Sequence, residues 1–512
     1  MHLRLAIIAT LAAGLQLLSP APAGAKEGQD PQAGPWPTES WPISTPEEQG
    51  VDSAALARLI ETVGGYKQDS VMVVRHGRIV ADAYFAPYVA GISHDLRSVT
   101  KSVVGTLTAI QLQKGALDSV EHPVMDLFSD KRIENVDDRK RAMTVQSLLD
   151  MTSGIRWTER FYTPDETIMQ MYRSFDRTAF VLDQPMAEAP GAHFNYAGGN
   201  PYLLSALVNR KSGQNALEFA TRELFEPLGI KSAKWRPIDA QGIVDGEAGL
   251  FLSPHDMARF GYLYLRNGTW EGRQIIPSAW VDRVKEGKVS ATNGFHYGNL
   301  WWSLPEKGAY MARGRHSQLI LVIPKLDVVA VMTGVLRDTE FYSISGLIDD
   351  ITRAIKSDEP LPADPIAAAS LASAIRQAAT EKPITVSGSP DLAKKVSGKL
   401  YQLPGNPLHV TSFTLNFLDP EPSWAYTTDL STDRNTGKFG LDGYYRKSTT
   451  APYGTTAARG RWTSERTFMM DARNLGRGEV ATWTFVFDGD RVTVEYENTD
   501  GFRTELRGRT SE

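Results

Sequence analysis

A serine and a lysine three positions apart are the first residues whose types and spacing could carry chemistry. They are Ser98 and Lys101, in the stretch Ser-Val-Thr-Lys. On a helix, residues i and i+3 share a face, so the two side chains could exchange a proton. A serine hydroxyl is a weak nucleophile until a base takes its proton, and a lysine is such a base only if its surroundings lower its pKa. The spacing also fits an ordinary helical turn, since chance alone produces Ser-x-x-Lys about once or twice in a chain of this length.

Two further stretches could complete a site of this kind. Tyr196 lies in Phe-Asn-Tyr-Ala-Gly-Gly-Asn, where a glycine-rich turn could present its phenol to a cleft; the alternative is a core tyrosine whose hydroxyl finds one partner. Residues 314–318 (Gly-Arg-His-Ser-Gln) directly precede a β-rich run. A glycine-led polar stretch that enters a strand can offer a backbone N–H to an oxyanion. The alternative is a solvated edge of the sheet.

The elements that must position these residues alternate between strand and helix patterns. The β-rich runs 70–75 and 78–84 are joined by a His-Gly turn, which predicts a hairpin. Apolar spacing predicts a helix over 98–113, and Ser-Pro-His-Asp at 253–256 is typical of the start of another. A second hairpin is expected at 319–332 and a final helix at 341–355. Strands at both ends with helices between them predict an α+β fold: an antiparallel sheet flanked by helices, with an inserted helical region.

The pattern changes after residue 356. Residues 358–364 contain two prolines and three acidic residues, as in a linker, and an alanine-rich helix is expected at 367–379. From 398 onward apolar and polar residues alternate between Asp-Gly turns, which predicts a C-terminal all-β meander, a small barrel or sandwich. The catalytic domain is therefore placed at 51–356, a linker with a short helix at 357–397 and a β domain at 398–512. We expect the β domain to fold independently, so that a chain ending near Lys356 keeps its nucleophile reactive.

Composition restricts the possible partners and the compartment. Residues 1–25 combine Arg4, an apolar run and Ala-Gly-Ala, which predicts a cleavable signal peptide and export to a periplasm or medium; residues 26–50 form an extended lead-in. The formal net charge of −5 and the lack of long basic runs argue against a nucleic-acid partner. No later stretch is apolar enough to span a membrane. There are no cysteines, and no histidine pair has the spacing of a zinc site.

Taken together and in this order, the three stretches resemble the serine β-lactamase and penicillin-recognising family. The resemblance is greatest to its class C-like esterase branch, which includes the aminohexanoate-dimer hydrolases, and it covers roughly residues 40–356. Two more stretches resemble that branch: 148–154 (Leu-Leu-Asp-Met-Thr-Ser-Gly) and 252–261 (Leu-Ser-Pro-His-Asp-Met-Ala-Arg-Phe-Gly).

The resemblance implies a role for each candidate residue. Ser98 is then the acylated nucleophile, Lys101 its partner and Tyr196 the general base, while the backbone N–H groups of Ser98 and Gln318 form the oxyanion hole. The segment that lines the substrate pocket in place of Lys-Thr-Gly consists of Arg315, His316 and Ser317.

Two departures bear on the substrate. The family often has Tyr-x-Asn, and Gly198 stands at the asparagine position. The third motif lacks both the Lys and the Gly of Lys-Thr-Gly. Both differences argue against efficient β-lactam turnover and favour another ester or amide.

The predicted function is therefore a serine hydrolase that cleaves an ester or amide bond of a small substrate, with no cofactor and no metal. The alternative is a non-catalytic or weakly catalytic cell-wall or ligand-binding protein with the same fold. The sequence carries no signal for oligomeric state.

Overall fold

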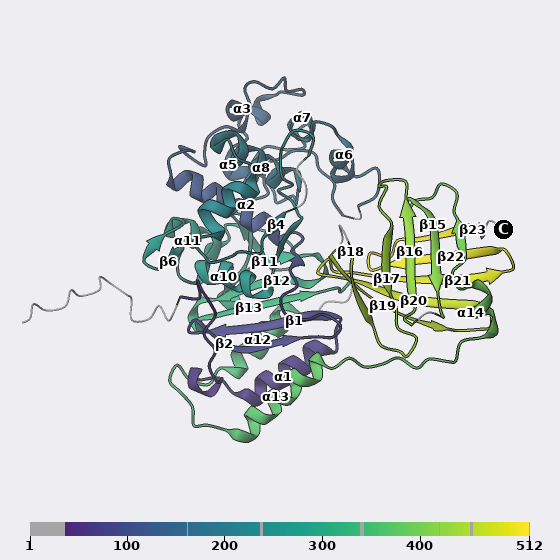
Figure 1. The fold of residues 1–512 in the computed structure, drawn as a ribbon. Coiled ribbons are helices and arrows are strands. Elements are labelled where there is room, and N and C mark those ends of the chain that lie inside the picture. Colours follow the sequence, from purple (N-terminus) through teal and green to yellow (C-terminus); the bar gives the residue numbers. More distant parts are fainter. Residues whose placement is uncertain are drawn as a thin grey trace, which may run out of the picture.

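The computed structural model describes residues 36–160, 162–235, 239–337, 343–418, 420–450 and 454–510. The predicted signal peptide and the start of the lead-in lie outside these ranges. Two parts stand side by side, an α+β part and a β part formed by the C-terminal residues (Figure 1).

An antiparallel sheet of eight strands forms the centre of the first part, in the order β2-β1-β13-β12-β11-β10-β9-β8. The first two strands of the chain therefore pair with the strands that end this part, β1 lying against β13. His76 and Gly77 both have positive φ in the tight turn between β1 and β2, as the hairpin prediction requires. The strands are β1 Gln68–Arg75, β2 Arg78–Tyr84, β8 Val289–Ser290, β9 His296–Gly298, β10 Trp301–Leu304, β11 Ala309–Gly314, β12 Gln318–Ile323 and β13 Val328–Gly334.

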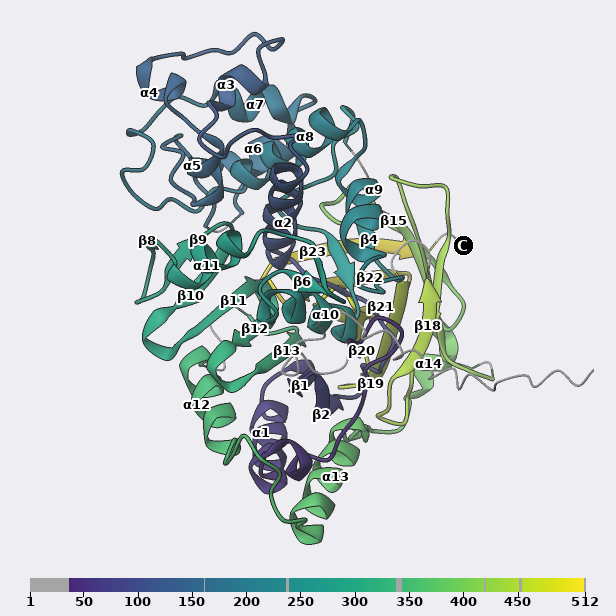
Figure 2. The ribbon, with the colours of Figure 1, turned by 90° about the vertical axis from the view of Figure 1, so that its left-hand side faces the viewer.

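Helices cover both faces of this sheet because the side chains along each strand point alternately into two apolar cores. On β12, Ile320 and Val322 are buried with α2 (Val99–Gln113) and α10 (Pro254–Leu265). Leu319 and Leu321 face the other way, into the core shared with α1 (Ser53–Gly64), α12 (Ile344–Ala354) and α13 (Pro365–Ala379). Figure 2 shows α2 above the sheet and the other group below it. The predicted α+β fold with an antiparallel sheet flanked by helices is confirmed.

The helical region inserted between β2 and β8 builds the wall above α2. Its elements are α3 Val124–Leu127, α4 Asp138–Arg141, α5 Val145–Leu149, α6 Thr167–Arg173, α7 Arg177–Asp183, α8 Gly199–Ser212, α9 Ala216–Ala220 and α11 Ser278–Glu286, with the short strands β3 His94–Asp95, β4 Lys234–Trp235, β5 Leu250–Leu252, β6 Thr269–Trp270 and β7 Arg273–Gln274. Among the described helices, none is long and apolar enough to cross a membrane.

The C-terminal part is a ten-stranded antiparallel sheet in the order β17-β16-β15-β14-β23-β22-β21-β20-β19-β18, which curls until β17 approaches β18. The predicted all-β meander is thus confirmed as a near-barrel. The short helix α14 (Asp391–Val396) precedes it. Its strands are β14 Leu400–Gln402, β15 Val410–Asn416, β16 Ser423–Thr428, β17 Asn435–Lys438, β18 Arg446–Thr450, β19 Gly454–Trp462, β20 Thr467–Leu475, β21 Glu479–Asp488, β22 Arg491–Asn498 and β23 Arg503–Thr510.

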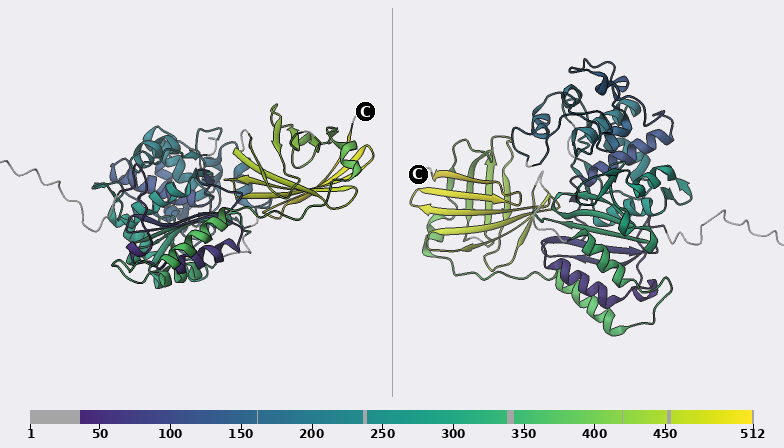
Figure 3. Two further views of the ribbon diagram at one scale, coloured as in Figure 1. Left: turned by 60° about the horizontal axis from the view of Figure 1, so that its bottom comes forward. Right: turned by 180° about the vertical axis from the view of Figure 1, so that it is seen from behind.

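The near-barrel meets the catalytic part at the ends of its strands (Figure 3). The buried carboxylate of Asp69 on β1 accepts from His94 Nε2 at 3.0 Å and pairs with Arg473 of β20. Burial by itself would raise the pKa of Asp69, but the Arg473 guanidinium and His94 hold it below its ordinary value. The Arg97 guanidinium donates to the carbonyl oxygen of Arg477 at 2.8 Å. A charged network therefore connects the two parts next to the segment that leads into α2.

Candidate active site

Ser98 stands at the N-terminal end of α2, and its hydroxyl is not used to cap the helix. The Lys101 Nζ atom, one turn further on, donates to Ser98 Oγ at 2.9 Å. The predicted i, i+3 pairing is therefore present. Val99, Val103 and Leu107 of the same helix are fully buried, which anchors the end of the helix that carries the nucleophile.

Lys101 is buried against a carboxylate that no sequence motif indicated. Its Nζ donates to Glu247 Oε2 and to the Glu247 carbonyl oxygen, both at 2.9 Å. Burial by itself would lower the pKa of Lys101, but Glu247, together with Tyr196 and Glu159, outweighs burial and raises the pKa above its ordinary value. Lys101 is therefore an ammonium ion at neutral pH. It supplies positive charge and a hydrogen bond to Ser98, and it is not the base in the resting site.

The Glu247 side chain is itself held in place. The Tyr172 hydroxyl of α6 donates to its other oxygen, Oε1, and the Glu247 backbone N–H donates to Asp245 Oδ1 at 3.0 Å. Residues 245–247 lie in a turn-rich stretch without helix or strand periodicity. Only the fold brings this glutamate to α2, so no spacing in the sequence could have indicated it.

Tyr196 lies beside the same pair. The Lys101 Nζ atom is 4.9 Å from the centre of its ring, and the Ser98 side chain lies near enough to the phenol to lower its pKa. The ring stacks on Trp302 of β10 at a centroid distance of 6.0 Å. Burial raises the pKa of Tyr196, and the Lys101 ammonium opposes that rise. The resting tyrosine is therefore a protonated phenol that lies beside the candidate nucleophile.

A glutamate fills the space left by the missing asparagine. The Gly198 backbone N–H donates to Glu159 Oε2 at 2.5 Å, and the Trp157 indole N–H donates to the same oxygen at 2.9 Å. A Cβ added at Gly198 would lie 2.8 Å from that oxygen, so any larger side chain there would displace Glu159. Burial raises the pKa of Glu159 to about 7, against the pull of the Lys101 ammonium. No motif in the sequence indicated this second acidic group either.

The third motif approaches Ser98 through its first residue. A Cβ added at Gly314 would lie 2.3 Å from the Leu96 carbonyl oxygen and 3.0 Å from the Ser98 backbone nitrogen. Strand β11 also continues beyond Met311, its last residue paired with β10. The backbone edge of Gly314 therefore lies open beside the nucleophile.

Gln318 is placed differently from Gly314. It pairs with Gly314 on β12, a strand flanked by β11 and β13. Backbone N–H groups of a strand point in the plane of the sheet at its neighbours. The Gln318 side-chain amide donates to the carbonyl oxygens of His316 and Gly334, at 3.1 and 2.8 Å. Gln318 as the second donor to an oxyanion therefore stays a prediction, and the backbone beside Gly314 is a second candidate for that role.

Two of the three residues predicted to bind substrate meet the C-terminal part. His316 is buried, and its Nε2 lies 2.9 Å from Asp500 Oδ1, in the turn between β22 and β23. Arg315 lies 3.3 Å from the same oxygen, with its guanidinium over the Tyr162 ring. Hydrogen bonding with His316 and the nearby arginines lower the pKa of Asp500 to about 2. Ser317 has a φ of 71° in the turn that leads into β12. Asp500 is thus a site neighbour supplied by the other part of the chain.

The structure therefore brings Ser98, Lys101 and Tyr196 into one cluster and adds Glu159 and Glu247 to it. Within the described ranges, no group of three or more His, Asp or Glu side chains could hold a metal ion.

Comparison with known proteins gives matches that agree with this geometry. The family model described as Beta-lactamase matches residues 56–334. A 6-aminohexanoate-dimer hydrolase from Paenarthrobacter ureafaciens is 25% identical over 345 residues, which cover 61% of this chain and 86% of that protein.

Solved structures share the fold at lower identity. A protein from Bacillus anthracis assigned as a 6-aminohexanoate-dimer hydrolase superposes with a TM-score of 0.52 at 21% identity, covering 62% of this chain and 88% of the other. A protein from Bacteroides dorei assigned as a beta-lactamase has a TM-score of 0.50 at 18% identity, covering 60% of this chain and all of the other, at 100%.

Proposed function

Because the chain belongs to the beta-lactamase family, we propose that it is a serine hydrolase that cleaves an ester or amide bond of a small substrate through an acyl-enzyme on Ser98. The observation that carries the proposal is the convergence of two proton-handling groups on one hydroxyl: Lys101 Nζ donates to Ser98 Oγ at 2.9 Å, and Tyr196 lies beside this pair, with Lys101 Nζ 4.9 Å from the centre of its ring. The relative named 6-aminohexanoate-dimer hydrolase supports an amide or ester as the bond that is cleaved.

Acylation is a proton relay in this proposal. Ser98 Oγ attacks the carbonyl carbon, and the serine proton passes to the Tyr196 oxygen as the phenol gives its own proton to the leaving oxygen or nitrogen. A protonated phenol can do this without first losing its proton, which agrees with the raised pKa of Tyr196. The Lys101 ammonium stabilises the negative charge that develops on the serine and tyrosine oxygens.

Deacylation uses the same groups in reverse. A water molecule attacks the acyl carbon, its proton passes to Tyr196, and the phenol proton returns to Ser98 Oγ as the acyl–oxygen bond breaks. The oxyanion of each step is bound by the Ser98 backbone N–H, at the start of α2, and by a second backbone N–H, that of Gln318 or one beside Gly314. We further propose that the protein is exported by its predicted signal peptide, residues 1–25.

The test is covalent labelling followed by intact mass. A fluorescent alkyl phosphonate should add one adduct to the wild-type chain and none to Ser98→Ala, while Ser290→Ala, which alters an exposed serine on β8, should label like wild type. Tandem mass spectrometry should place the adduct on Ser98. A folded wild-type chain that neither takes the label nor cleaves a panel of short esters and amides would favour the alternative, a ligand-binding protein with this fold.

A further inference from the structure

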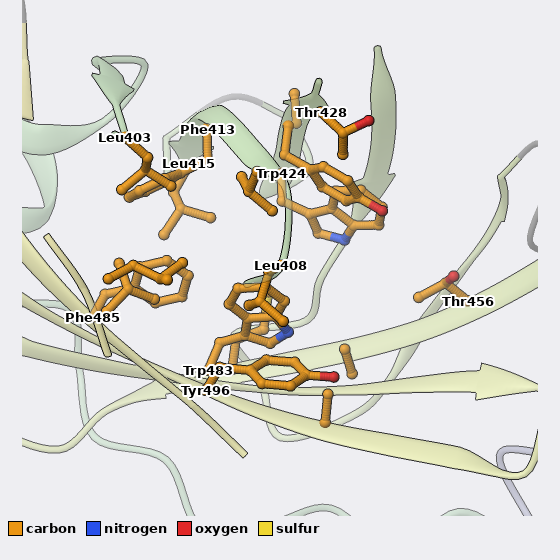
Figure 4. A pocket seen from close by; sticks show the side chains of 18 of the residues that line it. Leu403, Leu408, Phe413, Leu415, Trp424, Thr428, Thr456, Trp483, Phe485 and Tyr496 are labelled. Atoms are coloured by element: carbon orange, nitrogen blue, oxygen red, sulfur yellow. The ribbon is translucent and has the colours of Figure 1, made fainter. Parts of the chain in front are cut away.

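The C-terminal near-barrel encloses a cavity that plays no part in the proposed hydrolysis. Its volume is about 350 Å³, at the lower end of the range of small-molecule sites. It lies between the wall formed by β15 and β16 and the wall formed by β20 to β22. Figure 4 shows Trp424 on the first wall opposite Trp483 and Tyr496 on the second.

The two ends of the near-barrel are filled differently. At one end aromatic rings pack directly on one another: Phe417 and Phe468 have a centroid distance of 4.9 Å, and Phe417 and Trp462 one of 5.1 Å. Toward the other end, inward positions on β20 and β21 carry the small residues Ala472 and Ala481. The interior is therefore a solid core at one end and a hollow at the other. An apolar hollow of this size forfeits the contacts that a close-packed interior provides, unless a ligand occupies it.

The cavity also presents a hydrogen-bond donor that nothing in the described chain satisfies. Trp424 is 9% exposed, and its buried indole N–H has no partner among the described residues. The ring points into the cavity (Figure 4). A buried donor of this kind needs an acceptor, so the occupant should bring an oxygen to this point.

The polar end of the cavity lies at the boundary with the catalytic part. Glu479 accepts from the Asn474 amide at 3.1 Å and from the Tyr496 hydroxyl at 3.4 Å. Arg477 also borders this end, and its carbonyl oxygen receives the hydrogen bond from Arg97. The opposite charges of Glu479 and Arg477 give this end no net positive charge, and an unpaired anion is costly to bury in the apolar hollow, so an uncharged head group is favoured over an anionic one.

We propose that this cavity is a binding site for an uncharged amphiphile, with a medium-length aliphatic or aromatic body and a carbonyl or ether oxygen that accepts the Trp424 N–H. The site is separate from Ser98, so the proposal does not depend on the proposed hydrolase activity.

Fluorescence of N-phenyl-1-naphthylamine, a neutral apolar probe, tests the proposal. The full-length Ser98→Ala chain should bind the probe, and this background keeps turnover out of the readout. Methyl decanoate should displace the probe at a concentration about tenfold lower than decanoate does, since the cavity favours an uncharged head. No probe binding to the folded chain, or equal displacement by the two competitors, would overturn the proposal.

Three variants locate the binding. Ala481→Phe fills the cavity from β21 and should weaken probe binding about tenfold or more, whereas Thr484→Phe, on the outer face of the same strand, should leave it unchanged. Trp424→Phe keeps the ring but removes the donor. It should weaken displacement by methyl decanoate about fivefold and leave displacement by decane unchanged.

Ala472→Phe, from the neighbouring strand, is a second filling variant in case Ala481→Phe fails to fold, and melting temperatures establish which variants fold. Probe binding that survives filling in a folded variant places the probe elsewhere and overturns the proposal. If neither filling variant folds, the Trp424→Phe result decides.

Discussion

At the scale of single residues, the site is a buried cluster of charged and polar side chains, and their protonation states determine which group can transfer a proton. Lys101 lies between two acids, and its firm pairing with Glu247 keeps it protonated. Glu159 has a pKa raised by burial to about 7, so it changes charge near neutral pH. In the proposed reaction the transferred proton therefore belongs to Tyr196, and the groups around it set how easily its oxygen can bear negative charge.

Ser98→Ala and Tyr196→Phe should block the proposed hydrolysis at different steps. Ser98→Ala removes the attacking oxygen, so no acyl-enzyme forms. Tyr196→Phe keeps the nucleophile but removes the relay, which typically costs about 10²–10⁴ in rate. Water attack needs the same relay, so acylated enzyme should accumulate during long incubation with an ester, as measured by intact mass. Wild-type turnover in Tyr196→Phe would reduce Tyr196 to a packing residue.

Activity should fall as the pH rises through about 7, because ionised Glu159 raises the pKa of Tyr196 and opposes charge on its oxygen. Ionisation of this buried acid also costs stability. Its folded-state pKa lies above the ordinary 4.5, so the free energy of unfolding should decrease between pH 4.5 and about 7 and level off above that.

Glu159→Gln should remove both pH effects. Glu61→Gln, which alters an exposed residue of α1, should retain them. The measurements are kcat/KM for a nitrophenyl ester and urea unfolding, each against pH. A profile in Glu159→Gln that still falls near pH 7 would assign the titration to another group.

β-Lactams should be poor substrates. The position that holds an amide in the resembled enzymes carries no side chain at Gly198, and the Glu159 carboxyl occupies that space. Above pH 7 this carboxylate also repels the carboxylate of nitrocefin. We expect nitrocefin to be hydrolysed more slowly than a short-chain nitrophenyl ester at equal concentration. The reverse order would mean that Glu159 moves aside when substrate binds.

At the scale of elements, the reactive geometry depends on how closely β11 approaches the start of α2. Gly314 makes this contact possible because its α-carbon lies against the Leu96 carbonyl and the Ser98 nitrogen. Its φ of −132° is open to any residue, so the requirement for glycine comes from the close approach alone.

Gly314→Ala should therefore impair catalysis more than stability. The added methyl group pushes the nucleophile segment away from the sheet, and a misplacement of about 1 Å can cost about 10²-fold in rate. Gly346→Ala in α12 is a suitable control, because its added Cβ makes only ordinary contact with Ser343. The comparison is kcat/KM together with the melting temperature. Unchanged kcat/KM in Gly314→Ala would show that this approach does not set the oxyanion hole.

At the scale of the whole molecule, the near-barrel is joined to the catalytic part by buried charge. Asp69 is 1% exposed, and its partners are His94 and, across the boundary, Arg473. Helix α13 packs on α1 and contributes Leu371 and Ala374 to the lower core before the chain crosses to the barrel. The two parts are separate in strand order but are joined by an ion pair, and α13, which follows the linker-like stretch, belongs to the core of the catalytic part.

We therefore expect a chain that ends after Lys356 to be destabilised and to label slowly with the phosphonate, in contrast to the behaviour expected from the linker-like sequence. It lacks α13 and leaves the Asp69 carboxylate without Arg473, and a buried charge that loses its partner costs about 3–5 kcal/mol. Arg473→Met in the full chain isolates the loss of the ion pair with Asp69. Arg503→Met, which breaks an exposed pair with Glu497, should cost little. Urea unfolding measures each, and a truncated chain as stable as the full one would contradict the expectation.

The sequence by itself determined what depends on local spacing. Helical spacing placed Ser98 and Lys101 on one face of α2, alternation and Gly-containing turns predicted the hairpins and the β meander, and Ser253 with Pro254 marked the start of α10. These features depend on residues within a few positions of one another, so the chain shows them without its fold.

Only the tertiary structure decided the charges and the approach of distant segments. Glu247 reaches Lys101 from 146 positions away, and Asp500 reaches His316 from 184 positions away. The pKa of Lys101 is raised because Glu247 and the other groups around it outweigh the effect of burial. Whether Gly314 or Gln318 adjoins the nucleophile likewise depends on which strand edge is left open. No pattern in the sequence encodes such contacts, because they arise when the sheet and the near-barrel pack together.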